Sequence, residues 1–212
     1  VSVDGGAGND TIDMDGTLSA GDTVKGGAGT DTLEITTAAA TGTTSVGVSE
    51  FEVLSYAVAG GTTQDMAQFT NDTFTQIVAN VAAATTFTNV GSSTNELRFI
   101  SSGSNTTTFT RLVDTSSNAV TIGAYTDANA TLNNLTAANE ETINVTGGAM
   151  DADNVTLTIS TLTAEDLVTL NISGDQNTDV AAIAAQTTAT LTTVDASSAG
   201  GTVDVTASNA TL

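Results

Sequence analysis

Apolar and polar residues alternate in short runs along most of the chain, and this pattern predicts β-strands rather than helices. The clearest run is VTLTIS at residues 155–160, where Val155, Leu157 and Ile159 would face a core and the residues between them would face solvent. Comparable runs predict further strands at residues 49–58, 85–90, 96–100, 108–113, 119–122 and 203–206.

Residues 64–84 carry a mixed pattern. Residues 65–69 (DMAQF) suit a short helix, whereas residues 73–81 (TFTQIVANV) suit a strand, so the pattern leaves this stretch open between the two. The chain contains no proline. This agrees with β-ladders in which every backbone N–H is needed as a donor.

The C-terminal half repeats itself with an offset of 27 residues. Residues 135–137 and 142–147 recur as residues 162–164 and 169–174, and residues 193–197 form a looser third copy. Strand-forming repeats of this length are typical of a solenoid, in which each coil buries its apolar row only by stacking on its neighbours.

Two nine-residue segments near the N-terminus, residues 5–13 and 26–34, fit the pattern G-G-x-G-x-D-x-U-x, in which U is a large apolar residue. This pattern is a calcium-binding β-helix repeat. Its glycines permit left-handed backbone angles that turn carbonyl oxygens toward a cation, and its aspartate supplies an anionic oxygen. The alternative is a glycine-rich linker with incidental acids, and two matches so close together favour the repeat.

The spacing of the acids predicts how these turns stack. Asp10 and Asp31 are 21 residues apart, and a degenerate half-repeat around Asp22 lies between them. We expect the two glycine turns to stack directly, with Asp22 on the opposite side and a half-coil, residues 14–20, that is three residues over-long. Strands stack about 4.8 Å apart, so the carboxylates would repel by several kcal/mol unless a divalent cation lay between them. The predicted calcium ligands are Gly5, Gly6, Gly8, Asp10, Asp22, Gly26, Gly27, Gly29 and Asp31.

The amino-acid composition limits the kinds of molecule that this chain can bind. The 212 residues carry a net charge of -21 and only three basic side chains, Lys25, Arg98 and Arg111. Nucleic acids and anionic membrane surfaces are excluded, because binding to phosphate needs a cationic surface. No apolar run is long enough to cross a membrane. The chain has no cysteine, and calcium can replace disulfides as the bracing of a secreted protein.

These patterns predict an all-β fold, in which a calcium-binding parallel β-roll leads into an irregular right-handed β-solenoid. The roll would occupy residues 1–34, an irregular solenoid segment residues 35–130, and the solenoid with the internal repeat residues 131–212. Residues 1–4 resemble the end of an earlier repeat, so we expect the sequence to be a piece of a larger protein.

Acids at other predicted corners allow two interpretations. Residues 151–154 (DADN) and 174–177 (GDQN) could hold further calcium ions, although single acids in turns are usually only solvated. The acidic pairs at residues 140–141 and 165–166 could belong to a catalytic site, but solvated corners explain them better. The chain has no histidine or cysteine, so most acid–base and nucleophilic constellations are missing, and we expect no enzyme.

The acidic, cysteine-free composition and the G-G-A-G-x-D repeats resemble the RTX-type surface-layer proteins of Gram-negative bacteria, although the nonapeptides are few here. Weaker, low-complexity likenesses lie at residues 50–54, 84–90, 141–145 and 169–175. The resemblance implies type I secretion, folding on meeting extracellular calcium, and assembly into a two-dimensional lattice on the cell surface. It also implies an N-terminal lipopolysaccharide anchor and a C-terminal secretion signal, and neither is visible in this sequence.

Three functions remain open at this point. The favoured one is a structural module of a secreted bacterial surface layer that self-associates with bound calcium. The second is an RTX-type adhesin, for which ice is one candidate surface because threonine rows such as Thr156/Thr158 and residues 106–108 resemble flat threonine arrays. The irregular spacing of the threonines counts against such an array. The third and least favoured is a calcium-dependent polysaccharide lyase that uses Arg98 or Arg111.

Overall fold

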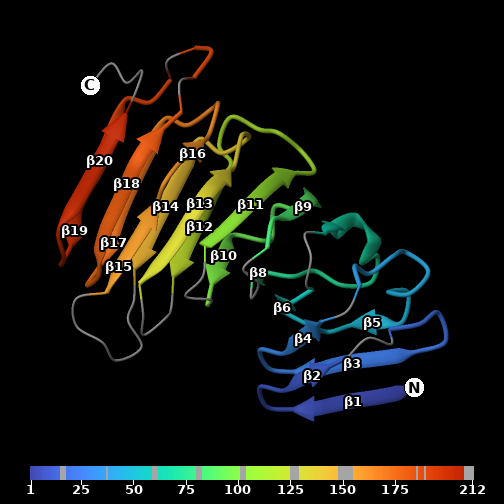
Figure 1. Cartoon of the computed structure of the whole chain (residues 1–212). Helices are drawn as coiled ribbons and strands as arrows, with labels where there is room; N and C mark the ends of the chain where they lie inside the picture. The colour runs from blue at the N-terminus through green and yellow to red at the C-terminus, as the bar shows by residue number, and fades with distance from the viewer. Residues whose placement is uncertain are drawn as a thin grey trace.

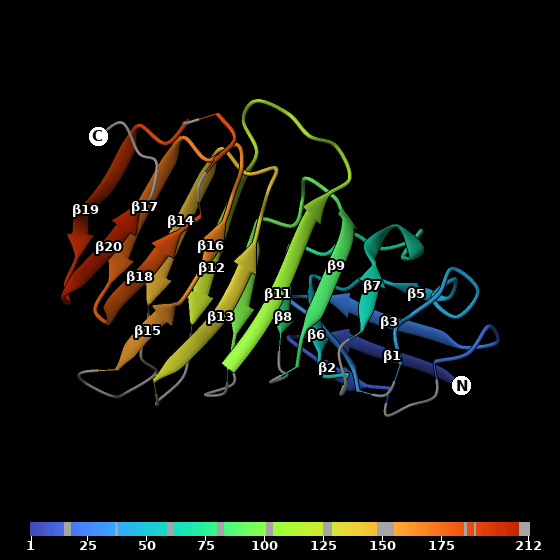
Figure 2. The same ribbon diagram turned by 45° about the horizontal axis from the view of Figure 1, so that its top comes forward.

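A computed structural model describes residues 1–14, 18–36, 38–58, 62–79, 83–100, 104–124, 129–147, 155–184, 186–188 and 190–207. The described chain is all-β, and its parallel strands stack along one axis as a β-solenoid. The helical structure within these ranges is one 3-10 turn, η1 (Met66–Gln68). Figures 1 and 2 show β1 at one end of the stack and β19 and β20 at the other. The solenoid expected from the alternating pattern is therefore confirmed.

Three sheets build the solenoid. The short sheet joins β1 (Ser2–Ala7), β3 (Thr23–Ala28) and β5 (Val48–Ser49). The long sheet runs the length of the molecule in the order β19 (Thr193–Ala199), β17 (Thr169–Gly174), β14 (Thr142–Gly147), β12 (Ala119–Ala124), β10 (Glu96–Phe99), β8 (Gln76–Ala79), β6 (Val53–Tyr56), β4 (Thr32–Ile35) and β2 (Thr11–Asp13). The third sheet contains β7 (Thr63–Asp65), β9 (Thr85–Val90), β11 (Ser104–Arg111), β13 (Ala130–Thr136), β15 (Thr156–Ile159), β16 (Leu162–Thr163), β18 (Asn177–Ile183) and β20 (Val203–Ala207).

The core consists of stacked apolar rows. In the long sheet the strand register places one apolar residue of each coil above the next, in the row Ile12, Leu33, Leu54, Ile77, Leu97, Ile122, Val145 and Ile172. The members from Leu33 to Ile172 are at most 1% exposed, whereas Ile12 in the edge strand is only partly buried. Burial of each such side chain contributes about 1.5–3 kcal/mol, and only a neighbouring coil can provide it.

Several expectations about the strands are confirmed. β14 pairs with β17 at the predicted offset, with Thr142 opposite Thr169, and Leu135 lies opposite Leu162. β17 in turn pairs with β19, which contains the looser third copy. The ambiguous stretch forms β7, the η1 turn and β8, so it contains both kinds of element that its pattern allowed.

Two strand predictions are corrected by the structure. Residues 49–58 do not form one strand, because β5 ends at Ser49 in the short sheet and β6 begins at Val53 in the long sheet. Glu50 between them has a left-handed backbone, with φ of 65°, and hydrophobic alternation cannot reveal such a corner. The strand expected at residues 108–113 ends earlier, at Arg111, because the chain leaves the sheet there and exposes the next two apolar side chains.

No helix in the described ranges is both long enough and apolar enough to span a membrane.

Candidate metal centre

The two glycine turns stack directly, as their spacing predicts. β1 pairs with β3 in parallel, and Gly6 lies opposite Gly27. Between the turns the Gly8 N–H donates to the Ala28 carbonyl oxygen at 2.9 Å. Backbone hydrogen bonds therefore hold one turn in register with the other.

Only glycine fits at the crowded positions of the second turn. Gly27 has a φ of 111° and Gly29 a φ of 153°. A Cβ atom on Gly27 would lie 2.1 Å from the Gly6 carbonyl oxygen, and one on Gly29 would lie 1.8 Å from that of Gly8. At Gly6, where φ is 94°, a Cβ atom would meet nothing within 4 Å. The crowding at Gly27 and Gly29 thus comes from the first turn, which is stacked directly against the second.

Asp10 and Asp31 come from the same corner of successive coils. The Asp10 N–H donates to Asp31 Oδ1 at 2.7 Å, and Asp31 is completely buried. The other carboxylate oxygen of each residue, Oδ2, is buried and has no hydrogen-bond partner. A buried carboxylate oxygen without a partner is costly, and a cation beside it would remove that cost.

The oxygens around these two atoms are of the kind that calcium prefers. A Cβ atom on Gly5 would lie 2.9 Å from Asp10 Oδ2 and 2.5 Å from the Gly26 carbonyl oxygen. The arrangement repeats one coil later, where a Cβ atom on Gly26 would lie 3.0 Å from Asp31 Oδ2 and 2.0 Å from the Glu50 carbonyl oxygen. Carboxylate and carbonyl oxygens are hard ligands that suit calcium, so the residues present fit this ion.

Asp22 precedes a strand of the short sheet, whereas Asp10 and Asp31 precede strands of the long sheet. Both of its carboxylate oxygens are engaged. Oδ1 lies 2.5 Å from the amino group of Val1, and Oδ2 accepts from the Ser19 N–H at 2.7 Å and from the Ser19 hydroxyl at 2.9 Å. The amino group and then Ser19 hold the pKa of Asp22 below its ordinary value. In this structure Asp22 closes a turn and is not brought to the other two acids.

The row of acids continues beyond the glycine turns. The Asp31 N–H donates to Glu52 Oε2 at 2.8 Å, which repeats the contact between Asp10 and Asp31 one coil later. In the following coil the Phe51 N–H donates to Asp72 Oδ1 at 3.2 Å. The nonapeptide pattern misses both acids, because only one of its three glycines, Gly47, precedes Glu52 and none precedes Asp72. The constant offset of 21 residues from Asp10 to Asp31 to Glu52 is the signal that could have found the first of these.

Asp72 differs electrostatically from its neighbours. Burial raises the pKa of Asp72 to about 6, and the carboxylates of Glu52 and Glu50 add to the increase. Asp72 Oδ2 is buried without a hydrogen-bond partner. This carboxyl group therefore changes its charge in mildly acidic solution.

A second group of acids lies at the corners of later coils. Carboxylate oxygens of Asp114, Glu141 and Asp166 lie within 4.8 Å of one another, and Glu141 Oε2 also accepts the Asn118 N–H at 2.7 Å. Asp114 is exposed and the other two residues are half-buried, so water can solvate all three. In the sequence, Glu141 and Asp166 belong to separate predicted corners, and the structure brings the two carboxylates together. Of the other predicted corner sites, Asp175 is exposed and residues 151–154 lie outside the described residues.

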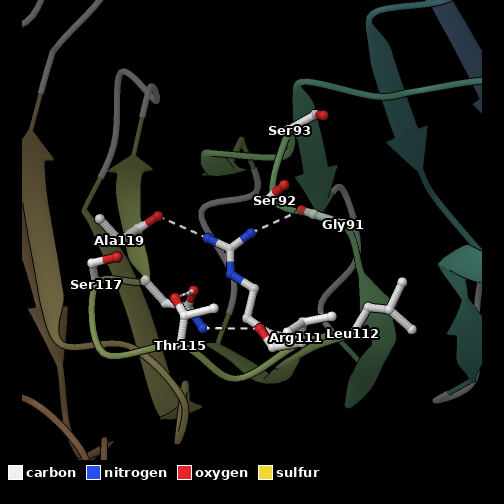
Figure 3. Close-up of a pocket in the computed structure, with 10 residues that line it drawn as sticks. Gly91, Ser92, Ser93, Arg111, Leu112, Thr115, Ser117 and Ala119 are labelled. Atoms are coloured by element: carbon white, nitrogen blue, oxygen red, sulfur yellow. Dashed lines mark hydrogen bonds between the residues drawn. The ribbon is translucent and has the colours of Figure 1, made fainter.

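A pocket of about 700 Å³ opens beside the loop that follows β11, and Arg111 forms part of its wall (Figure 3). The guanidinium group donates to Glu140 at 2.6 Å and to the carbonyl oxygens of Gly91, Thr94 and Ala119 at 3.0, 2.6 and 2.7 Å. Glu140 is completely buried; burial raises its pKa, and Arg111 opposes that increase. With a second bond to Glu140 at 3.3 Å, these contacts use all five N–H groups of the guanidinium. The Arg111 side chain therefore joins three loops and has no N–H left for a substrate.

Comparisons with protein-family models, with curated proteins and with solved structures find no match to this chain. Its function must therefore be argued from its residues and their geometry.

Proposed function

We propose that this chain is a calcium-stiffened structural module of a secreted bacterial surface layer. The observation that carries the proposal is the pair of buried, unpartnered oxygens, Asp10 Oδ2 and Asp31 Oδ2, in two glycine turns held in register. The net charge of -21 supports it, because a stack of acidic coils gains most from bound cations. The resemblance of the repeats to RTX-type surface-layer proteins supports the cellular setting. This setting includes type I secretion and lipopolysaccharide anchoring through other parts of a longer protein.

The chain's own groups would act in two ways. Asp10 and Asp31 would hold the ion together with carbonyl oxygens of the glycine turns, and the stacked backbone keeps these ligands in place. Bound calcium supplies the positive charge that cancels the repulsion between the carboxylates. At a calcium concentration one hundred times the dissociation constant, one such site stabilises the folded state by about 2.7 kcal/mol.

Because calcium binding would stabilise the fold, the stability of the chain would differ between the inside and the outside of the cell. Extracellular modules bind calcium with dissociation constants of about 0.1–1 mM. The first coils would therefore be loosely held at the low calcium level inside a cell and firmly stacked outside it. Copies of the stiffened module would then tile into a lattice, with calcium bridging their acidic surfaces.

A calcium titration tests the mechanism. We expect the free energy of unfolding of the parent chain, measured by circular dichroism in denaturant, to rise with calcium by about 1.4 kcal/mol per tenfold increase above the dissociation constant. The variants Asp10→Asn and Asp31→Asn remove one ligand charge each and should lose most of this increase. Asp204→Asn is the matched control, because Asp204 is exposed at the other end of the stack and the change in charge is the same.

Two outcomes would contradict the proposal. Equal stability of the parent chain in calcium and in chelator would exclude a calcium-braced fold, and an equal loss in Asp204→Asn would show only a general effect of charge. Electron microscopy with and without chelator tests the lattice separately. Sheets that form in the absence of calcium would overturn the calcium-dependent assembly.

A further inference from the structure

A column of threonines crosses the outer face of the third sheet. The strand register places one threonine from each of five successive coils in line, and the members are Thr63, Thr86, Thr108, Thr136 and Thr163. Thr63 is exposed and the other four are half-buried, while Phe87 and Phe109, the next residues after two of them, are buried in the core. At a strand spacing of about 4.8 Å the column is about 19 Å long. Figure 2 shows β7, β9, β11 and β13 side by side along it.

Further threonines widen this column. Thr88 lies two residues after Thr86 on β9, and Thr110 lies two residues after Thr108 on β11. Side chains two residues apart on a strand point to the same side of the sheet. Thr106 lies two residues before Thr108 on β11. Thr131 on β13 lies opposite Thr158 on β15. All of these side chains are half-buried. We call the combined set the threonine face: Thr63, Thr86, Thr88, Thr106, Thr108, Thr110, Thr131, Thr136, Thr158 and Thr163.

The alignment of these threonines cannot be seen in the sequence. Successive members of the column are separated by 23, 22, 28 and 27 residues, which is the irregular spacing that counts against an ordered array. In the folded chain the coils differ in length, and the strand register still places these five residues opposite one another. One-residue irregularities in the pairing of β11 lie before the column with β13 and after it with β9. The array is therefore regular in space although it is irregular along the chain.

The threonine face is uncharged in a chain that contains 24 acidic residues. On β9, β11, β13, β15 and β16 the one ionisable side chain is Arg111, which is buried against Glu140. Acidic side chains adjoin the two ends of the face, where Asp65 on β7 lies opposite Thr88 and Asp179 on β18 lies opposite Thr158. By contrast, several strands of the long sheet carry charges, at Asp13, Glu34, Glu96, Arg98 and Asp195, whereas its strands β12, β14 and β17 carry none.

We propose that the threonine face binds ice. Each threonine presents a methyl group beside a hydroxyl that both donates and accepts hydrogen bonds, and its branched side chain is stiff at χ1. Repeated at the strand spacing, these groups can hold water molecules in an order close to the lattice of ice. Because the sheet fixes the array before binding, little conformational entropy is lost on contact.

The chemistry of the face excludes other classes of partner. A charged polymer would find no counter-charge on these strands, and the aromatic side chains of β9 and β11 are buried, so no ring is available to stack on a sugar. A partner that is neutral, periodic and able to hydrogen-bond remains, and an ice surface has all three properties. This inference does not depend on the calcium site.

Slow growth of ice in a dilute solution of the folded chain tests the proposal. We expect the parent chain to be enriched in the ice at least tenfold over a protein of similar size and charge that has no such array. Thr108→Lys and Thr136→Lys place a charge at the centre of the column and should abolish the enrichment. Thr121→Lys is the matched control, because Thr121 is also half-buried in a central strand but belongs to the long sheet, and it should be retained in ice like the parent.

Exclusion of the parent chain from ice, or an equal loss in Thr121→Lys, would overturn the proposal. Circular dichroism in denaturant establishes whether each variant is folded. Thr108→Ser keeps the hydroxyl and removes only the methyl group, so it tests the column even if a lysine variant does not fold. We expect Thr108→Ser to lose enrichment several-fold while it keeps the circular dichroism spectrum and the unfolding midpoint of the parent, and full enrichment in this variant would contradict a role for the threonine methyl groups.

Discussion

Two completely buried acids, Asp31 and Glu140, show how differently two regions of this solenoid accommodate negative charge. In the first coils, Asp31 has backbone partners on one side, and its Oδ2 atom has none. In the later coils, Glu140 is paired with the buried guanidinium group of Arg111 at 2.6 Å. The protein supplies a buried counter-charge to Glu140, whereas the Oδ2 atom of Asp31 has no partner among the described residues.

The surrounding coils differ in the same way. The glycine turns repeat every 21 residues and are joined by backbone hydrogen bonds, and the apolar residue of the edge coil, Ile12, is only partly buried. The coils with the 27-residue offset bury Val145 and Ile172 almost fully and add an outward amide contact, Asn171 to Asn144 at 2.8 Å. Packing can therefore stabilise the later coils without an ion, whereas the first coil ends in an edge strand whose apolar residue is only partly covered.

The largest expected effect comes from removing the counter-charge of Glu140. Arg111→Ala leaves a buried carboxylate without its partner and three carbonyl oxygens without donors, and we expect a loss of about 3–5 kcal/mol in the free energy of unfolding. The loss should be equal in calcium and in chelator, because the pair is internal to the protein. Denaturant unfolding under both conditions measures it.

Arg98→Ala is the control for that variant. The Arg98 side chain is 36% exposed and pairs with Glu96 at 2.6 Å near the surface, so its removal should cost less than about 1 kcal/mol. A loss in Arg111→Ala that is as small as this, or that calcium restores, would remove the distinction between the two buried acids.

A smaller effect is expected from crowding in the glycine turns. Gly27→Ala combines a left-handed φ of 111° with a Cβ atom 2.1 Å from the Gly6 carbonyl oxygen, and we expect a loss of about 2–3 kcal/mol. Gly6→Ala has a similar backbone angle but open space around the new methyl group, so only the backbone strain should reduce stability, by about 1 kcal/mol. Thermal unfolding with and without calcium compares the pair, and Gly27→Ala should also weaken the calcium response. Equal losses in the two variants would show that the turns are not packed against each other.

The parts of this structure that the sequence predicts are those that repeat at a constant interval. Asp10 and Asp31 could be placed at one corner because the coil between them has a defined length, and Thr142 could be paired with Thr169 for the same reason. The alternation of apolar residues also predicts most strands, since each strand has one face in the core. Local pattern is sufficient where each coil repeats the one before it.

The remaining features depend on coils of unequal length. Arg111 reaches Glu140 from 29 residues away, and neither residue belongs to a repeat. The threonine column depends on the strand register between coils of unequal length, which no local pattern reveals. The corner at Glu50 requires a left-handed backbone at a residue that seldom adopts one. In each case the path of the chain around a corner decides the contact, and hydrophobic periodicity contains no information about that path.

The smallest effect concerns Asp72, which lies in the coil between the two regions. Its pKa is raised to about 6 from 3.8 by burial, so the folded state holds the proton more tightly than the unfolded state. The contribution to stability is therefore present below pH 3.8 and is lost as the pH rises to about 6. Asp72→Asn removes this dependence, and after allowance for partial exposure we expect the variant to be about 1 kcal/mol more stable than the parent at neutral pH. Unfolding in chelator across this pH range measures the difference between the two chains. A constant difference would mean that Asp72 titrates normally, and the costly burial of unpaired acids would then be confined to the glycine turns.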